Sequence, residues 1–427
     1  MNGWTEDRLA RAALASLLSY GATQVLALAA DMGAQQAWDA IKQAAGRAAP
    51  PKLPEAPPPG AEQVAGAGEA PILAGLDGDA VPTPRRGPLP SRDALMAWAS
   101  TVEPLRVADE TERAGLRFLI PGDDEWPESL SELGLVDIDS LGGLPVGLWV
   151  AGPGHLARWS QQAVAMVGAR AATRYGEAVA MRMASELAAD ADVPHWTIVS
   201  GGAYGIDAAS HRGALLMNGR TIGVFANGLG SNYPPGNASL IESIKRQGLA
   251  VSELPPSAHP TRQGFLSRNR IVAALSQGTV VVEAGVRSGA RNTASWASAL
   301  GRVVMAVPGP VTSAQSVTPH RLIRDGEATL VATSDDVRAL VQPLGDSPDV
   351  SAAGPSRRGD ELGGDEAVVR EALPSRGGMS VSEVVLASGV PVPRCIAALR
   401  KLAGSGFAVA DDQGRWKASQ PREEEAA

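Results

Sequence analysis

Short apolar runs alternate with helix-compatible segments through the middle of the chain. The runs are AVAMVG (163–168), WTIVSGG (196–202), TIGVFANG (221–228), LAVSE (249–253), TVVVEAG (279–285) and RVVMAVPG (302–309). Because they are apolar on both faces rather than alternately, we expect strands buried under helices on both sides. This alternation predicts an α/β fold with an extended Rossmann-like parallel sheet, in which a ligand binds at the carboxyl ends of the strands.

The pattern changes on both sides of this core. Apolar residues at helical spacing predict a small helical domain over 1–45, broken at Gly21 and Gly33. Residues 46–90 are rich in Pro, Ala and Gly and predict a disordered linker. The core is expected over 91–335, and a second linker over 336–362. Three helices and a two-stranded hairpin are predicted over 363–420, as in a winged helix, with Ser380 or Ser382 capping the second helix.

Charge and composition narrow the choice of ligand. The net charge is −8, yet residues 151–330 carry sixteen Arg and Lys against ten Asp and Glu. This basic centre indicates an anionic ligand, although solvated helix faces would give the same count. The single Cys395 excludes an internal disulfide, and the scattered histidines show no metal-ligand spacing, so we expect no cofactor. No apolar run approaches the roughly 20 residues of a membrane helix, and a reducing cytoplasm is the expected location.

Glycine-rich loops follow several of the predicted strands. They are VGARAATRYG (167–176), SGGAYGID (200–207) and VEAGVRSGARNTASWA (282–297), while FLSRNRIVAALS (265–276) begins a helix with two arginines. Glycines let a ligand approach the backbone, and helix N-termini bind phosphate. Cations at a helix start face the positive end of its dipole, so an anion should compensate them. We expect one of Arg268 and Arg270 to reach a phosphate and the other to pair internally, with Glu253 or Glu283.

The same loops offer little for catalysis. Ser200, Asp207 and His211 lie close in sequence but lack a nucleophile-elbow context. We expect Asp207 to cap its helix or bond the glycine loop, and His211 to pack or to bind phosphate. Glu253 and Glu283 form either a carboxylate pair or ion pairs with the two arginines, and we favour the ion pairs. Without a G-x-x-x-x-G-K-[ST] loop, no ATP hydrolysis is predicted, and the chain is expected not to be an enzyme.

Four segments in this order resemble the DNA-processing protein A family (DprA, also called Smf). They are SGGAYGIDAASHRGAL, NYPPGN, SELPPSAHPTRQGFLSRNRIVAALS and VVVEAGVRSGARNTASWASALGRVVMAVPG. The terminal domains also resemble those of the family, the first being of the SAM or helix-hairpin-helix type. The resemblance implies a core that binds and protects single-stranded DNA without cutting it. It also implies a homodimer and the loading of the RecA recombinase onto DNA taken up in natural transformation.

The resemblance further implies which residues contact DNA. They are Gly168, Arg170, Thr173, Ser200, Gly201, Gly202, Arg268, Asn269, Arg270, Ser288, Gly289 and Arg291. The family's Gly-[Ser/Thr]-Arg turn is Gly168-Ala169-Arg170 here, so one hydroxyl contact is lost. Ala238 stands where the family commonly has a lysine. Tyr204, Tyr233 and Phe265 are the candidates for stacking on bases, with core packing the expected role of Phe265.

Two other functions are consistent with parts of the sequence. One is a Rossmann-like nucleotide phosphoribohydrolase, but VPGPVTS is the nearest run to the P-G-G-x-G-T-x-x-E loop of such enzymes. The other is a regulator that binds duplex DNA through its winged helix. Residues 361–418 carry seven acidic and seven basic residues, and a neutral domain is a poor duplex reader.

Overall fold

The computed structural model describes residues 3–19, 23–46, 91–138, 141–189, 196–342 and 362–419. The chain divides into two units, Met1–Pro348 and Asp349–Ala427, which are treated separately. Most of the two predicted linkers lies outside the described residues. The start of the second linker is an exception, because helix α13 (Ser334–Val341) occupies it, held by a capping box between Thr333 and Asp336. The predicted domain boundaries themselves stay predictions.

The described residues before the first strand form five helices: α1 (Glu6–Leu18), α2 (Gln24–Met32), α3 (Ala34–Ala45), α4 (Arg92–Thr101) and α5 (Pro104–Arg113). The Thr5 side chain caps α1, and Gly33, at φ +84°, separates α2 from α3 as the glycine pattern predicts. Arg8 in α1 donates to the Phe118 carbonyl and pairs with Asp123 at 2.7 Å. Because Phe118 belongs to the first strand, these contacts fix α1 to the edge of the sheet.

One nine-stranded sheet forms the centre of the unit. Its strands are β1 (Arg117–Leu119), β2 (Leu148–Ala151), β3 (Ala163–Val167), β4 (Thr197–Ser200), β5 (Thr221–Phe225), β6 (Leu249–Ser252), β7 (Gly278–Val281), β8 (Val303–Ala306) and β9 (Thr329–Leu330). Their order across the sheet is β1-β2-β6-β5-β4-β3-β7-β8-β9. In this spatial order, every neighbouring pair of strands between β6 and β9 is parallel. The predicted parallel sheet is therefore confirmed, with β2 added antiparallel to both β6 and β1.

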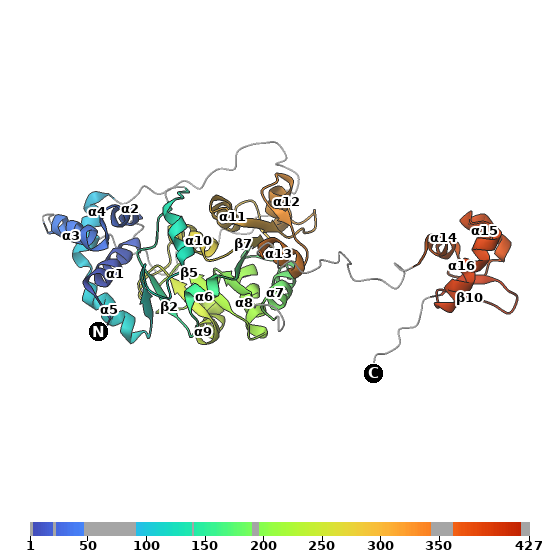
Figure 1. The fold of residues 1–427 in the computed structure, drawn as a ribbon, viewed down its shortest axis with the longest axis horizontal. Helices are drawn as coiled ribbons and strands as arrows, with labels where there is room; N and C mark the ends of the chain where they lie inside the picture. Colours follow the sequence, from blue (N-terminus) through green and yellow to red (C-terminus); the bar gives the residue numbers. More distant parts are fainter. Residues whose placement is uncertain are drawn as a thin grey trace. The chain divides into compact units, whose positions relative to one another are not determined.

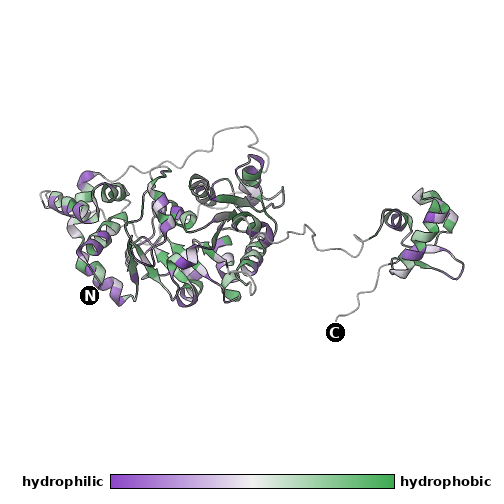
Figure 2. Ribbon diagram, in the orientation of Figure 1, coloured by the Kyte–Doolittle hydropathy of each residue, from purple (hydrophilic) through white to green (hydrophobic). Residues whose placement is uncertain are grey.

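Helices cover both faces of this sheet, as the apolar strands require. One core packs α6 (Leu156–Ser160), α10 (Arg262–Ala274), α11 (Ala290–Ala299) and α12 (Val317–Arg324) on one face. Another packs α7 (Arg174–Ala188), α8 (Ile206–Leu216) and α13 on the other face, and a third joins α1–α4 with α9 (Ala238–Gln247). Figure 1 shows α10 and α11 on the opposite side of the sheet from α7 and α8, and Figure 2 shows largely hydrophobic strands between them.

The described residues of the C-terminal unit form three helices and a hairpin. They are α14 (Gly364–Ala372), α15 (Val381–Ser388), α16 (Val392–Gly404), β10 (Ala408–Ala410) and β11 (Trp416–Ala418). Ser380 caps α15 through a capping box with Glu383, so the first of the two predicted caps is the correct one. This is the predicted order of elements, and its designation as a winged helix stays a prediction. No single helix among the described residues is long and apolar enough to cross a membrane; only α15 and α16 together reach that length, with a 105° bend between them.

Candidate nucleic-acid interface

The predicted site residues gather at one edge of the sheet. The loops after β3 to β8 all leave the carboxyl ends of parallel strands, which lie at the same edge. We call these loops, with the first two residues of the helices that follow them, the carboxyl edge. The strand order reverses between β3 and β7, and such switch points are where open α/β sheets bind ligands.

A buried glutamate fixes the loop after β3 at this switch point. Glu283 follows β7 and accepts hydrogen bonds from the Thr173 backbone N–H at 2.8 Å and from its hydroxyl at 2.7 Å. Thr173 also caps α7 by accepting from the Gly176 N–H. A Cβ at Gly168 or Gly176 would overlap Glu283, so both glycines are needed for this close approach. The hydroxyl of Thr173 is thus engaged inside the protein, and its predicted DNA contact stays a prediction.

The loop after β4 is equally tight. Ser200 is buried and donates to the Met166 carbonyl at 2.6 Å, so its hydroxyl bridges β4 and β3. A Cβ at Gly202, at φ +70°, would overlap Phe225. The Asn237 amide donates to the carbonyls of Gly202 and Ala203, each at 3.1 Å, which ties this loop to the segment before α9. The NYPPGN motif therefore acts here as a brace for the glycine loop.

Three consecutive residues of α10 each reach a different loop. Arg268 donates to the carbonyls of Gly201, at 2.8 Å, and Val224. Asn269 donates to the Gly289 carbonyl at 3.4 Å and to Asn292 at 3.2 Å. Arg270 reaches Glu253 and the Gly143 carbonyl. All three side chains are buried, so their observed role is to hold the loops of the carboxyl edge in register.

Arg270 is the arginine that pairs internally. Its side chain is 0% exposed, and it contacts Glu253 through two hydrogen bonds of 2.6 and 2.8 Å. The expected pairing with Glu253 is therefore observed, and Glu253 and Glu283 do not act as a carboxylate pair. Glu283 differs from expectation because it bonds Thr173 rather than an arginine. The predicted DNA contacts of Arg268, Asn269 and Arg270 stay predictions.

Arg268 lies in a buried polar cluster with two groups that the sequence singles out. Burial lowers the pKa of Arg268 to about 10, partly offset by the nearby Asp207 carboxylate. Burial also raises the pKa of Asp207, which accepts from the Ala203 N–H at 3.4 Å, as expected for a residue that bonds the glycine loop. His211 is fully buried against Thr221 at 2.7 Å, and burial lowers its pKa to about 3. A neutral His211 packs in the core and offers no charge to a phosphate.

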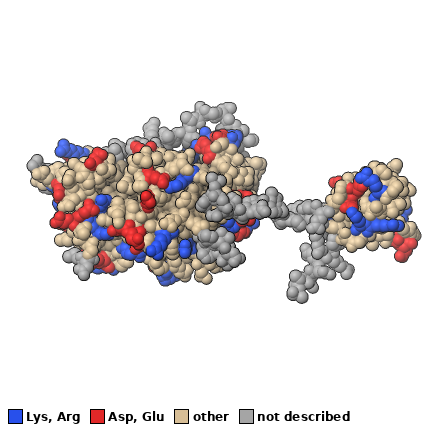
Figure 3. Space-filling view, viewed as in Figure 1, with Lys and Arg blue, Asp and Glu red and all other residues tan. Residues whose placement is uncertain are grey.

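The carboxyl edge exposes positive charge and conceals negative charge. Its cations are Arg170, Arg174, Arg262, Arg287 and Arg291, of which the first four are exposed and form no ion pair with another described residue. Its carboxylates are Asp207, Glu253 and Glu283, which are only 7%, 7% and 1% exposed. Elsewhere the signs are mixed, and the face drawn in Figure 3 carries acidic and basic side chains side by side. Within the carboxyl edge as defined, the exposed charge is therefore positive.

Two predicted contacts are modified by neighbours. Arg291 is paired with Glu327, with both carboxylate oxygens at 3.1 Å, and its side chain is 35% exposed. Ser288 accepts from the Ala290 N–H at 3.3 Å, next to the exposed Gly289. Arg262 was not among the predicted site residues, because the helix was expected to begin at 265 and begins at Arg262. Arg291 and Ser288, like the other predicted site residues, remain predictions as DNA contacts.

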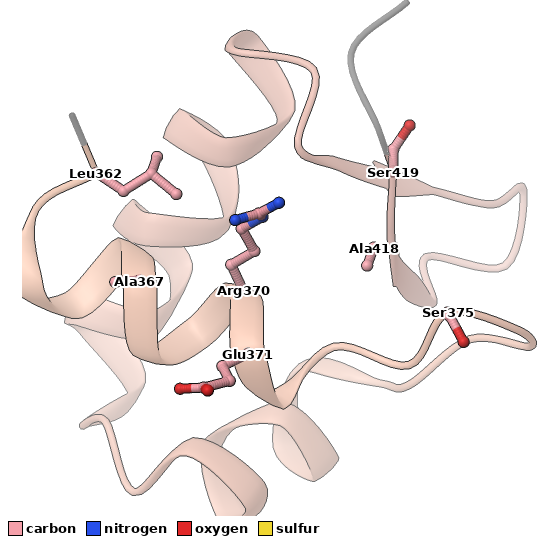
Figure 4. A pocket seen from close by; sticks show the side chains of 7 residues that line it. All are labelled: Leu362, Ala367, Arg370, Glu371, Ser375, Ala418 and Ser419. Atoms are coloured by element: carbon pink, nitrogen blue, oxygen red, sulfur yellow. The ribbon is translucent and has the colours of Figure 1, made fainter. Parts of the chain in front are cut away.

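Several basic side chains in the described part of the C-terminal unit are paired with acidic ones. On α16, Arg394 is paired with Asp365 at 2.6 Å and Lys401 with Glu366 at 2.8 Å. A hollow of about 610 Å³ lies between α14 and the end of β11, where Figure 4 shows Arg370 and Glu371 with Leu362, Ala367, Ser375, Ala418 and Ser419. These pairings agree with the neutral composition of the unit. Within the described residues of the whole chain, no group of His, Cys, Asp and Glu is arranged to hold a metal ion.

Comparisons with known proteins agree with this geometry. The family model described as DNA recombination-mediator protein A matches residues 117–342. A Mycobacterium tuberculosis protein that carries the name DNA processing protein DprA is 45% identical over 323 residues, which are 73% of this chain and 80% of that protein. Protein Smf of Escherichia coli K12 is 38% identical over 62% of this chain and 71% of its own length. The X-ray structure of DNA processing protein A (DprA) from Streptococcus pneumoniae is similar with a TM-score of 0.51 and 32% identity, covering 59% of this chain and 83% of that one.

Proposed function

Because the chain belongs to the DNA recombination-mediator protein A family, we propose that it binds single-stranded DNA along the carboxyl edge of its sheet. The observation that carries this proposal is the sign of the exposed charge. Four arginines that form no ion pair with a described residue are exposed at this edge, while its three carboxylates are buried. Phosphates of a flexible strand fit such a surface, and the glycine loops admit them close to backbone N–H groups.

Recognition in this proposal is of the DNA backbone. Arg170, Arg174, Arg262 and Arg287 contact phosphates, and the buried Ser267–Arg270 stretch keeps their loops in place. Backbone contacts carry no sequence information, so sequence preference is slight and salt dependence is strong. The protein holds the strand without cutting it, which is supported by the engagement of Glu253 with Arg270 and of Glu283 with Thr173.

The cellular role proposed for this activity follows the family. The protein protects incoming single strands and loads the RecA recombinase onto them during natural transformation or recombination, in the cytoplasm. It acts as a homodimer. An exposed sheet edge supports self-association, because β9 is the outermost strand and both of its residues are exposed, with Leu330 at 49%.

The test is fluorescence anisotropy of a labelled oligo-dT over a series of salt concentrations. Arg170→Ala should weaken binding and reduce the slope of log affinity against log salt by about 0.7, the value for one phosphate contact to a single strand. Arg182→Ala is the matched control, because Arg182 lies within α7 and pairs there with Glu186. Wild-type protein that fails to bind at low salt would refute the proposal, as would an Arg170→Ala protein indistinguishable from the control.

A further inference from the structure

Phe265 lies in the first turn of α10 and does not belong to the core. The next residue, Leu266, packs against one of the buried clusters, whereas Phe265 is half-buried and is part of none of them. This differs from the expected core packing. The α10 axis explains the difference, because adjacent residues on a helix point about 100° apart. The ring of Phe265 is therefore directed to the carboxyl edge while Leu266 is directed to the core.

Two side chains from other loops meet this ring. The guanidinium of Arg170, in the loop after β3, lies over it with its carbon 4.8 Å from the ring centroid. Tyr233, from the loop after β5, lies on its flank, with the centroids 6.0 Å apart and the planes at 47°. Arg170 forms no ion pair with a described residue, so the aromatic face is the partner of its charge. An exposed cation and two aromatic rings thus meet beside the carboxyl edge.

We propose that Phe265, flanked by Tyr233, is a stacking platform for one unpaired nucleobase, which Arg170 covers in the free protein. This deepens the proposed function and rests on it. A guanidinium over an exposed ring is worth a factor of about 2 to 5 in an equilibrium constant. A base stacked on an aromatic side chain raises the binding constant by a factor of about 5 to 150. A base therefore displaces the guanidinium of Arg170 from the ring, and the guanidinium is then free to bind the adjoining phosphate.

The platform gives the protein a means to distinguish single strands from duplexes. In a duplex both faces of each base are covered by its neighbours, whereas an unpaired base can rotate out and present a face to Phe265. Arginines alone attract both forms of DNA, because both carry phosphates. Phe265 is therefore the specificity-determining residue of the edge, and the arginines supply the affinity that depends on charge.

The experiment separates the base from the backbone. Anisotropy is measured with labelled oligo-dT and with an abasic oligonucleotide of equal length and charge. Phe265→Leu should weaken oligo-dT binding about 5- to 150-fold while leaving the affinity for the abasic strand and the salt slope unchanged. Phe265→Trp should retain the wild-type preference for oligo-dT. Trp4→Leu, which removes a ring that stacks on Phe118 outside the carboxyl edge, should leave both affinities unchanged.

Each other outcome overturns the platform. A Phe265→Leu protein with wild-type affinity for oligo-dT would show that no base stacks on this ring. A protein equally weakened for both oligonucleotides would show that Phe265 acts by shaping the loops. In both cases wild-type binding of oligo-dT would leave the proposed function standing. Wild-type protein that binds neither oligonucleotide would overturn the platform and the proposed function together.

Discussion

The substitution Glu253→Gln should destabilise the protein more than any change to a surface ion pair. It removes the charge that neutralises Arg270, whose side chain is 0% exposed while that of Glu253 is 9% exposed. The glutamine keeps nearly the same shape, so the perturbation is electrostatic. Arg270 would keep its hydrogen bonds to the Gly143 and Ser267 carbonyls but would lose both ionic hydrogen bonds to the carboxylate.

The magnitude follows from the burial. Removing one partner of a buried ion pair costs about 3–5 kcal/mol, because an uncompensated charge remains in a poorly polarisable interior. For a folded core of the size of this one, a loss of about 1 kcal/mol in the free energy of unfolding lowers Tm by roughly 2 °C. We therefore expect Glu253→Gln to lower Tm by about 6–10 °C. Replacing both residues by apolar ones of similar volume, Glu253→Met with Arg270→Met, should recover much of this loss.

The assay is thermal unfolding followed by circular dichroism. The matched control is Glu132→Gln, which breaks the pair with Arg302, where the side chains are 40% and 18% exposed. That pair should contribute at most about 1 kcal/mol, hence no more than roughly 2 °C. Equal shifts for Glu253→Gln and the control would refute the view that Arg270 is a buried cation whose charge depends on Glu253.

Three further changes test other parts of the structure. Burial lowers the pKa of His211 to about 3, whereas the pKa in the unfolded chain is about 6.5. The unfolded chain therefore takes up a proton at His211 below pH 6.5 and the folded protein does not. The stability that the neutral His211 contributes is complete above pH 6.5 and is lost toward pH 3, by up to ~1.4 kcal/mol for each pH unit. Tm should therefore fall less steeply between pH 7 and 5 in His211→Asn than in wild type, and parallel curves would contradict this. Gly201→Ala places a Cβ against the Arg268 guanidinium. It should lower the free energy of unfolding in urea by about 1–3 kcal/mol and weaken oligo-dT binding. A variant with unchanged stability and binding would show that Arg268 adjusts freely. Ser380→Ala removes the cap of α15 and should lower the free energy of unfolding of the C-terminal unit by about 0.5–2 kcal/mol. Hydrogen exchange should become faster only in peptides of this unit. Faster exchange in α1–α13 would contradict the division of the chain into two units.

The central strands were predictable because their environment is uniform. A strand covered by helices on both sides must be apolar at every position, and Ala163–Val167 and Val303–Ala306 are examples that need no long-range information. The antiparallel pairing of β2 with β6 was not predictable in this way, because it depends on contacts between residues about a hundred positions apart, such as Val150 with Val251.

Helix α13 was not predictable from the sequence for a different reason. Its sequence follows the last strand without a long apolar stripe, and its first turn is acidic, so the segment reads as the start of a polar linker. The structure shows the capping box that stabilises it, with the Thr333 hydroxyl accepting from the Asp336 N–H and Asp336 accepting from the Thr333 N–H. Val337 anchors the helix by packing into the core beside α7. A capping box and one apolar side chain are therefore enough to form two turns of helix when that side chain can pack against a sheet.

The two arginines of α10 illustrate what the sequence alone leaves open at the site. Residues two apart on a helix point roughly 200° away from each other, so the sequence predicts that Arg268 and Arg270 have different partners. It does not say which partner is an anion. In the structure Arg270 meets the Glu253 carboxylate, and its charge is cancelled. Arg268 instead donates to two carbonyls, and the carboxylate nearest to it belongs to Asp207, whose pKa is raised by burial. The positive potential of the carboxyl edge therefore comes from the exposed loop arginines with Arg268 beneath them. Arg270 contributes the rigidity that keeps those arginines on one edge.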